Sequence, residues 1–253
     1  MRLKTLAFLT VIAGSAGSAC FGDVLSITSS KDNTLIQNAT GDLSNGAGSG
    51  MFVGNTHQTG DNIRRGLVAF NVAAAIPAGS TITNVSVTLT CNRSRGGGIT
   101  VGLFPMLADW GQAGSDSGPF GGSGTDSQRG DATWIHRFYA PVGGQTWITE
   151  GGDFNSVASA TKSVGGTGTF TWSSNAALVA IVQSWLNTPT QNFGWMLKST
   201  NEGGSQNAKR FATMEEPVAA SRPRMTIEYT VPSPGVASLL ACSATVVLGR
   251  RRR

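Results

Sequence analysis

Four consecutive residues have the types that acid–base chemistry on an acidic sugar requires. They are His136, Arg137, Phe138 and Tyr139. A polysaccharide lyase uses a tyrosine or histidine as the base and an arginine to neutralise the uronate carboxylate. On a strand, His136 and Phe138 would lie on one face, and Arg137 and Tyr139 on the other. The run keeps a lyase open as an alternative function, although chance proximity is the simpler explanation.

Other catalytic signatures are missing from the sequence. The two histidines, His57 and His136, form no His-Glu-x-x-His zinc motif, and no Gly-x-Ser-x-Gly nucleophile motif occurs. A glycosidase needs two carboxylates that flank one bond, and the spacing of the 14 acidic residues selects no such pair. We therefore predict that the protein is not an enzyme, with a lyase or hydrolase as the less favoured alternative.

A long polar segment could supply oxygen ligands for a cation. Residues 111–130 are rich in glycine, serine and aspartate, and loops of this length are uncommon in compact domains. Ca²⁺ binds carboxylate oxygens, so the candidate ligands are Asp116, Asp126 and Asp131. Their spacing matches no EF-hand loop, and solvated loop aspartates are the alternative interpretation. No other cofactor is predicted.

Basic residues at the starts of strand-like runs are candidates for binding an anionic polymer. Arginine pairs bidentately with carboxylates, and strands that lie side by side would bring these residues into one patch. The alternative is that they are solvated edge residues that discourage aggregation between strands. The candidates are Lys31, Arg64, Arg65, Lys209 and Arg210.

One of the six tryptophans is a candidate for stacking on a sugar ring. Most of them follow strand-like or helical apolar patterns and are expected in the core, where aromatic burial is most favourable. Trp110 stands directly before the polar segment 111–130. We therefore expect Trp110 to be the exposed tryptophan and to take part in carbohydrate binding.

Short alternating segments separated by glycine-rich turns must position these candidates. The clearest are 66–72, 82–91, 99–104, 168–172, 192–198, 210–214 and 225–231. Cys91 continues the apolar phase of Val85, Val87 and Leu89, which predicts a buried, unreactive thiol. The pattern indicates an all-β fold, a β-sandwich.

One segment has helical periodicity. Leu178, Ile181, Val182 and Trp185 fall at positions i, i+3, i+4 and i+7. Ser174 or Asn175 could cap its amino end. We therefore predict one short helix within the sandwich.

The amino-terminal end resembles an export signal. Residues 1–22 hold a basic start, an apolar stretch and a run of small residues, which is the pattern of a cleaved signal peptide. Lipidation of Cys20 is a less favoured alternative, because Gly17 stands where a large aliphatic residue is expected.

The carboxyl-terminal end, residues 232–253, has a sorting pattern. An apolar run of residues 235–249 would rise only about 22 Å as a helix, short of the roughly 30 Å hydrocarbon core of a bilayer. It stands between a Pro-x-Pro tripeptide and an arginine cluster, made of Pro232, Ser233, Pro234, Arg250, Arg251, Arg252 and Arg253. This order resembles the PEP-CTERM class of bacterial sorting signals, with Ser233 where that class usually has glutamate. The resemblance implies a hydrophobic helix that anchors the chain transiently in the inner membrane and is then removed; a short permanent anchor is the alternative.

The charge distribution argues against nucleic-acid binding. The net charge is +5, but six of the 19 basic residues lie in the two terminal segments. Residues 23–231 therefore carry 13 basic and 14 acidic residues and are nearly neutral. The basic balance belongs to the ends of the chain and not to a basic surface.

The body of the chain, residues 23–231, resembles DNRLRE domains. The motifs that carry the resemblance are 32–36, 51–54, 64–72, 76–80, Trp110, Ala132-Thr133-Trp134, Trp147 with 151–154, 178–186, 192–195, Arg210-Phe211, Glu215, and Pro223 leading to Ile227 and Tyr229. Gln112 stands where the family commonly has glutamate. The resemblance implies a jelly-roll-like β-sandwich, similar to carbohydrate-binding modules, in exported or surface proteins.

Together these patterns predict a secreted protein with three parts: a signal peptide, one domain and a sorting or anchor segment. The expected location is the cell surface or extracellular matrix of a bacterium, reached through the export and sorting machineries. The expected role is non-catalytic binding of polysaccharide, acidic polymers included. A purely structural or adhesive surface protein without a defined ligand is the alternative.

Overall fold

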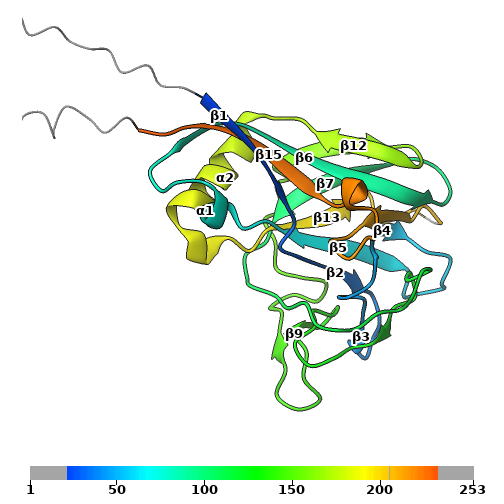
Figure 1. Ribbon diagram of the computed structural model, residues 1–253. Helices are drawn as coiled ribbons and strands as arrows, with labels where there is room; N and C mark the ends of the chain where they lie inside the picture. The colour runs from blue at the N-terminus through cyan, green and yellow to red at the C-terminus, as the bar shows by residue number, and fades with distance from the viewer. Residues whose placement is uncertain (1–21, 205, 233–253) are drawn as a thin grey trace, which may run out of the picture. The chain divides into compact units, whose positions relative to one another are not determined.

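The computed structural model of the chain describes residues 22–204 and 206–232 (Figure 1). The predicted signal peptide, apart from Gly22, and the sorting segment from Ser233 onward lie outside the described residues. Within them, no helix combines the length and the apolar composition that crossing a membrane requires. Residues 22–231 form one compact unit, and the fold described below is that of this unit.

The described residues form fifteen strands, two α-helices and two 3-10 helices. The strands are β1 (Gly22–Thr28), β2 (Lys31–Ile36), β3 (Leu43–Ser44), β4 (Gly50–Asn55), β5 (Ile63–Ala69), β6 (Thr81–Ser94), β7 (Ile99–Pro105), β8 (Thr125–Asp126), β9 (His136–Phe138), β10 (Gln145–Thr146), β11 (Ala160–Val164), β12 (Gly168–Trp172), β13 (Trp195–Ser199), β14 (Lys209–Ala212) and β15 (Arg224–Thr230). The helices are α1 (Val72–Ala75), α2 (Ala176–Asn187), η1 (Pro189–Gln191) and η2 (Ala219–Ser221).

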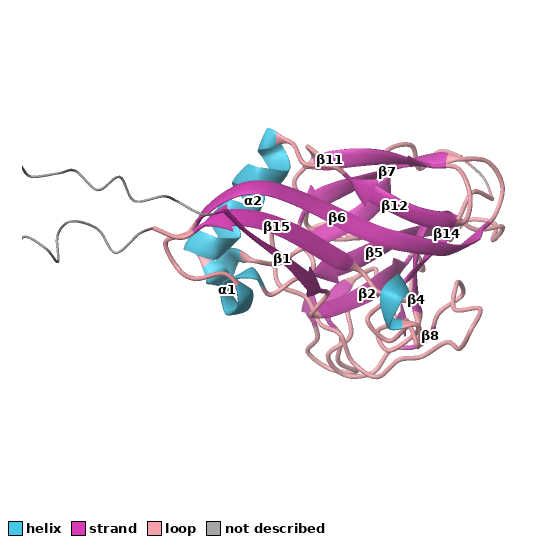
Figure 2. Ribbon diagram, turned by 45° about the horizontal axis from the view of Figure 1, so that its top comes forward, coloured by secondary structure: helices cyan, strands magenta, loops and turns pink. Residues whose placement is uncertain are grey.

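The main sheet is antiparallel, has eleven strands and curls on itself (Figure 2). Its hydrogen-bonded order is β1-β15-β6-β14-β4-β5-β13-β7-β11, with β12 added on β6 and β2 on β5. β4 joins the two halves, because Gly50 to Val53 pair with β14 while Gly54 and Asn55 pair with β5. The prediction of an all-β, sandwich-like fold is confirmed.

The main core lies inside the curl of the sheet. In β6, Val85, Val87, Leu89 and Cys91 alternate with more exposed residues, so one face of the strand is apolar. The prediction that Cys91 is buried is confirmed, and its burial raises the pKa of the thiol.

The predicted helix is α2, and it packs against β6 at one end of the sheet (Figures 1 and 2). Asn175 caps it by accepting a hydrogen bond from the backbone N–H of Leu178 at 2.9 Å. Leu178, Val182 and Trp185 face the main core. The helix therefore closes this end of the sandwich.

A second core covers the opposite face of β2, β5 and β13. Its members are Leu35, Leu67, Ala69, Phe104, Met106, Trp110, Ala132, Trp134, Trp147 and Met196. Much of the cover comes from the mostly irregular segment 106–158. These strands are therefore buried on both faces. Nearly all of their residues are buried, instead of alternating between buried and exposed.

Candidate ligand-binding site

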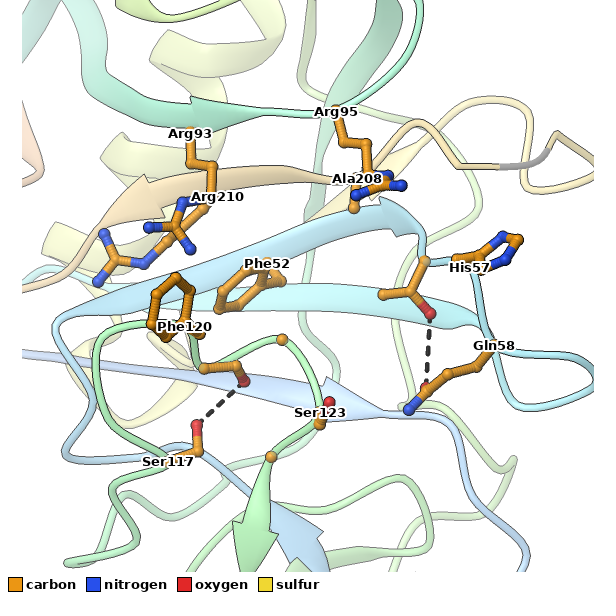
Figure 3. Close-up of a pocket in the computed structure, with 14 residues that line it drawn as sticks. Phe52, His57, Gln58, Arg93, Arg95, Ser117, Phe120, Ser123, Ala208 and Arg210 are labelled. Atoms are coloured by element: carbon orange, nitrogen blue, oxygen red, sulfur yellow. Dashed lines mark hydrogen bonds between the residues drawn. The ribbon is translucent and has the colours of Figure 1, made fainter.

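One hollow in the described residues has a volume of about 520 Å³. We call it the arginine pocket, because Arg93, Arg95 and Arg210 line it together with Phe52 and Phe120 (Figure 3). Within the part of the chain that the structure describes, no aspartate or glutamate lines it. Its volume is within the range of small-molecule sites, roughly 300–1,000 Å³.

Strand register places the key side chains of this pocket in one row. Phe52 of β4 is the partner of Arg210 of β14, and Arg210 is the partner of Arg93 of β6. Directly opposed residues in an antiparallel sheet project to the same face. Their neighbours Met51 and Phe211 point into the main core, so this row lies on the outer face of the sheet.

A bulge in β6 aims Arg93 outward. Phe211 pairs with Cys91, but Arg210 pairs with Arg93, so Asn92 is the extra residue. With strict alternation from Cys91, Arg93 would project toward the main core. The bulge shifts the alternation by one residue, as bulges beside functional sites commonly do.

Arg210 is fixed in the wall of the pocket. It is 7% exposed and donates to Asn92 Oδ1 at 2.7 Å and to Ser49 Oγ at 2.9 Å, while its Nε has no partner. Burial lowers the pKa of Arg210, and the negative charge of Glu216 partly offsets this effect. Gly50 makes this position feasible, because a side chain there would collide with the guanidinium group.

Phe120 forms the exposed rim of the pocket. It is 73% exposed, and Arg93 lies over its ring at 4.6 Å from the centroid. Figure 3 shows Arg93 and Arg210 next to Phe120 at one end of the view and Arg95 at the other. Among the described residues, no carboxylate forms an ion pair with any of the three arginines. The pocket therefore presents positive charge and an aromatic face to a ligand.

Two of the predicted basic residues donate hydrogen bonds to backbone that forms or adjoins the wall of this pocket. Arg64 is 1% exposed, and its Nε donates to the carbonyl oxygen of Gly122 at 2.7 Å. Lys209 is buried and donates to the carbonyl oxygens of Arg95 and Gly97 at 3.1 and 2.7 Å. Both side chains position backbone that lines or adjoins the pocket, and neither is free to meet a polymer.

The remaining basic candidates lie elsewhere, so the five do not form one patch. Lys31 forms an ion pair with Asp109 at 2.6 Å and lies 4.3 Å from the centroid of the Trp110 ring. Arg65 projects to the face opposite Arg64, forms an ion pair with Glu202 at 2.9 Å and lies over Trp134. Only Arg210 of the predicted set lines the arginine pocket.

The expectation that Trp110 is exposed is wrong. It is 1% exposed, belongs to the second core and donates from its indole N–H to the carbonyl oxygen of Phe193 at 2.8 Å. The segment that follows it folds back over the sheet and does not leave the ring in solvent. Trp110 therefore stabilises the fold and cannot stack on a sugar in this conformation.

The aspartates predicted as calcium ligands are not brought together. Among the described residues, no group of three or more His, Cys, Asp or Glu side chains is arranged to hold a metal ion. Asp116 accepts from the N–H of Gly118, and Asp126 is an exposed residue of β8. Asp131 is buried and accepts from the backbone N–H groups of Ala113 and Gln128 at 2.7 and 2.9 Å. Asp131 therefore organises the loop and does not point into a cation site.

The run that suggested a lyase begins in β9, away from the arginine pocket. The His136 ring meets the edge of the Tyr139 ring at a centroid distance of 5.4 Å. His136 Nδ1 lies within hydrogen-bonding distance of the carbonyl oxygen of Gly41 and of Thr133 Oγ1, at 3.1 and 3.2 Å. None of these residues lines the arginine pocket.

A buried carboxyl pair lies outside the arginine pocket. Asp32 is completely buried; its Oδ2 accepts from the N–H of Met214 at 2.8 Å, and its Oδ1 has no partner. Glu215 interacts with it, and Glu215 Oε2 also lacks a partner. Burial, and then the negative charge of Glu215, raise the pKa of Asp32 well above its ordinary value.

Gln112 forms hydrogen bonds with both members of this pair. Its Oε1 accepts from the N–H of Asp32 at 2.8 Å, which leaves its amide nitrogen facing Glu215. That nitrogen donates to Glu215 Oε1 at 2.6 Å and to the carbonyl oxygen of Gly46 at 2.7 Å. The amide nitrogen of Gln112 thus supplies a donor to the buried carboxyl pair.

Arg93, Arg95, Phe52 and Phe120 are pocket residues that the sequence analysis did not single out. The signal for Arg93 and Arg95 was their spacing of two residues immediately after the run 82–91. Phe120 had no such signal, because only the folded loop brings it beside Arg93.

Comparison with known proteins adds no relatives. No family model matches the chain, and no curated protein matches it. The functional argument therefore depends on the residues themselves.

Proposed function

We propose that the chain is an exported, non-catalytic surface or matrix protein whose domain binds an acidic polysaccharide in the arginine pocket. The observation that carries this proposal is the lining of Arg93, Arg95 and Arg210 without an acidic residue. Guanidinium groups suit the carboxylates of uronic acids, and Phe120 offers an exposed ring for the apolar face of a sugar. The jelly-roll-like arrangement and the kinship with carbohydrate-binding modules, suggested by the resemblance to DNRLRE domains, belong to the same proposal.

The location follows from the two terminal segments. Export through the signal peptide 1–22, transient membrane anchoring through 232–253 and release by the sorting machinery would place the domain outside the cell. An extracellular polysaccharide would then be its natural partner. A structural or adhesive protein without a ligand is the competing function.

We expect Arg93→Ala and Arg95→Ala each to weaken binding to alginate or polygalacturonate by about tenfold, because each removes one charge-assisted contact. Both residues are exposed, so the variants should fold. Affinity electrophoresis or calorimetry with the full chain measures the effect. Binding should also weaken as salt rises to 0.5 M, where exposed charges are screened.

Arg224→Ala is the matched control for this experiment. It removes the same charge from an exposed residue of β15 that does not line the pocket, and it should leave the affinity within about twofold. Equal losses in all three variants would indicate nonspecific attraction. Failure of the wild-type chain to bind any acidic polymer would favour the structural alternative. Unsaturated products that disappear in Tyr139→Phe would establish a lyase.

A further inference from the structure

A second hollow lies next to the arginine pocket. Its volume is about 400 Å³, and Gln58 lines both hollows. Leu43 lines the second one, and a side chain added at Gly124, which lines the first, would lie 3.3 Å from Leu43 Cβ. The two hollows therefore share side chains in the wall between them. Neighbouring units of one polymer could occupy both hollows.

The electrostatics of the second hollow differ from those of the first. It is lined by one carboxylate, Asp61, and by one guanidinium group, Arg64. Arg64 already donates to the carbonyl oxygens of Gly122, Asp61 and Ile63 and to Gln58 Oε1. A ligand there meets the exposed carboxylate of Asp61, whereas the Arg64 guanidinium group is buried and its donors are largely occupied.

The polar groups that line the second hollow include both donors and acceptors. The Asp61 carboxylate is exposed and has no ion pair within the described residues, so its oxygens can accept hydrogen bonds from a ligand. Gln58 Oε1 accepts from Arg64 and Gln37 Oε1 accepts from the N–H of Ile63, so the two amide nitrogens serve as donors, as can the Thr59 hydroxyl. Hydroxyl groups both donate and accept, whereas a carboxylate can only accept. The set therefore suits the hydroxyls of a neutral sugar and disfavours a second uronate.

We infer that the two hollows together recognise an acidic heteropolysaccharide, with an acidic unit in the arginine pocket and an adjacent neutral sugar in the second hollow. This inference rests on the proposed function of the arginine pocket. It predicts that a polymer in which uronate and neutral sugars alternate binds more tightly than a polymer of uronate alone.

The test compares two probes on the full chain: hyaluronan, which alternates glucuronate with N-acetylglucosamine, and polymannuronate, which is uronate throughout. We expect the wild-type chain to bind hyaluronan at least about tenfold more tightly. Asp61→Asn removes the repulsion and adds a donor, so the preference should fall to less than about threefold through tighter binding of polymannuronate. Arg95→Ala should weaken binding to both polymers alike.

Glu228→Gln is the matched control, because it removes one negative charge from an exposed residue that lines neither hollow. It should leave the preference unchanged. Equal wild-type affinity for the two polymers, or a preference that survives Asp61→Asn, overturns the inference while leaving the arginine pocket intact. Absence of binding to either polymer, or no effect of Arg95→Ala, overturns the proposed function itself.

Discussion

Replacement of Arg64 by alanine should lower the free energy of unfolding by about 3–4 kcal/mol. The side chain is buried, and its guanidinium group is the donor for three backbone carbonyl oxygens and for Gln58. Alanine removes the donor of these hydrogen bonds. It also leaves a cavity in the space that the arginine side chain fills. Denaturant unfolding measures the loss, and the melting temperature should fall by roughly 2–4 °C per kcal/mol.

The hydrogen bonds of Arg64, and not its charge, are the expected source of this stability. Burial lowers the pKa of Arg64 to about 10, so the group is still charged at pH 7 and its desolvation opposes folding. Arg64→Met removes that opposing effect and fills most of the space, but it supplies no donor to the carbonyl oxygens of Gly122 and Asp61. We expect methionine to destabilise the protein less than alanine, by about 1–3 kcal/mol.

Arg224→Ala provides the reference for Arg64, since an exposed arginine of β15 should change the free energy of unfolding by less than about 0.5 kcal/mol. A change of that size in Arg64→Ala would mean that the guanidinium group does not hold the wall of the pocket. Weakened polysaccharide binding in Arg64→Met, at temperatures where the variant is folded, would show that Gly122 needs this support.

Periodicity predicted the elements that have one buried and one exposed face. β6, β15 and α2 each pack an apolar face on the main core, so periods of 2 and 3.6 were visible in the sequence. β5 overlaps the segment 66–72, which was predicted to alternate, but two cores cover both faces of β2 and β5, so nearly all of their residues are buried. The second core could not be foreseen, because it depends on where the irregular segment after β7 folds.

The same segment explains the error at Trp110. Polar composition predicts exposure of a neighbouring side chain only when the polar residues face solvent. Here Asp131 accepts from backbone N–H groups within the segment, and Gln112 bonds to Asp32, Gly46 and Glu215 outside it, which lets polar residues cover an aromatic core. Local composition cannot reveal these long-range hydrogen bonds.

Strand pairing, which the sequence pattern did not predict, brings the side chains of the arginine pocket together. Arg210 was singled out beside Lys209, yet successive residues of a strand face opposite sides, so only Arg210 of these two reaches the pocket. Arg93 reaches it because the bulge at Asn92 shifts the phase of β6. One extra residue therefore decides whether Arg93 projects outward or toward the core.

Replacement of Asp32 by asparagine should stabilise the protein at pH 8, by about 1–3 kcal/mol. Asparagine Oδ1 can keep the hydrogen bond from the N–H of Met214, while its Nδ2 can donate to the unpaired Oε2 of Glu215. The substitution removes one ionisable group from the buried carboxyl pair and supplies a hydrogen-bond donor to the other. Thermal unfolding across pH measures the gain.

The pH dependence has a definite sign. Because folding raises the pKa of Asp32, the folded state binds this proton more tightly than the unfolded state does. This contribution is fully present below the unfolded value of about 3.9 and is lost as pH rises through the folded pKa. Relative to Asp32→Asn, the wild-type chain should therefore lose stability as pH rises from about 4, until the folded pKa is passed.

Asp131→Asn is the matched control, with the opposite expected sign. Both oxygens of this buried carboxylate accept backbone N–H groups, so an amide NH₂ would oppose a donor and cost about 1–3 kcal/mol. Opposite effects of one substitution at two buried aspartates would distinguish a carboxyl group that lies against another carboxyl group from one that anchors backbone N–H groups. Destabilisation in Asp32→Asn as well, together with a lower wild-type melting temperature in EDTA, would show that Asp32 and Glu215 hold a cation instead of a proton.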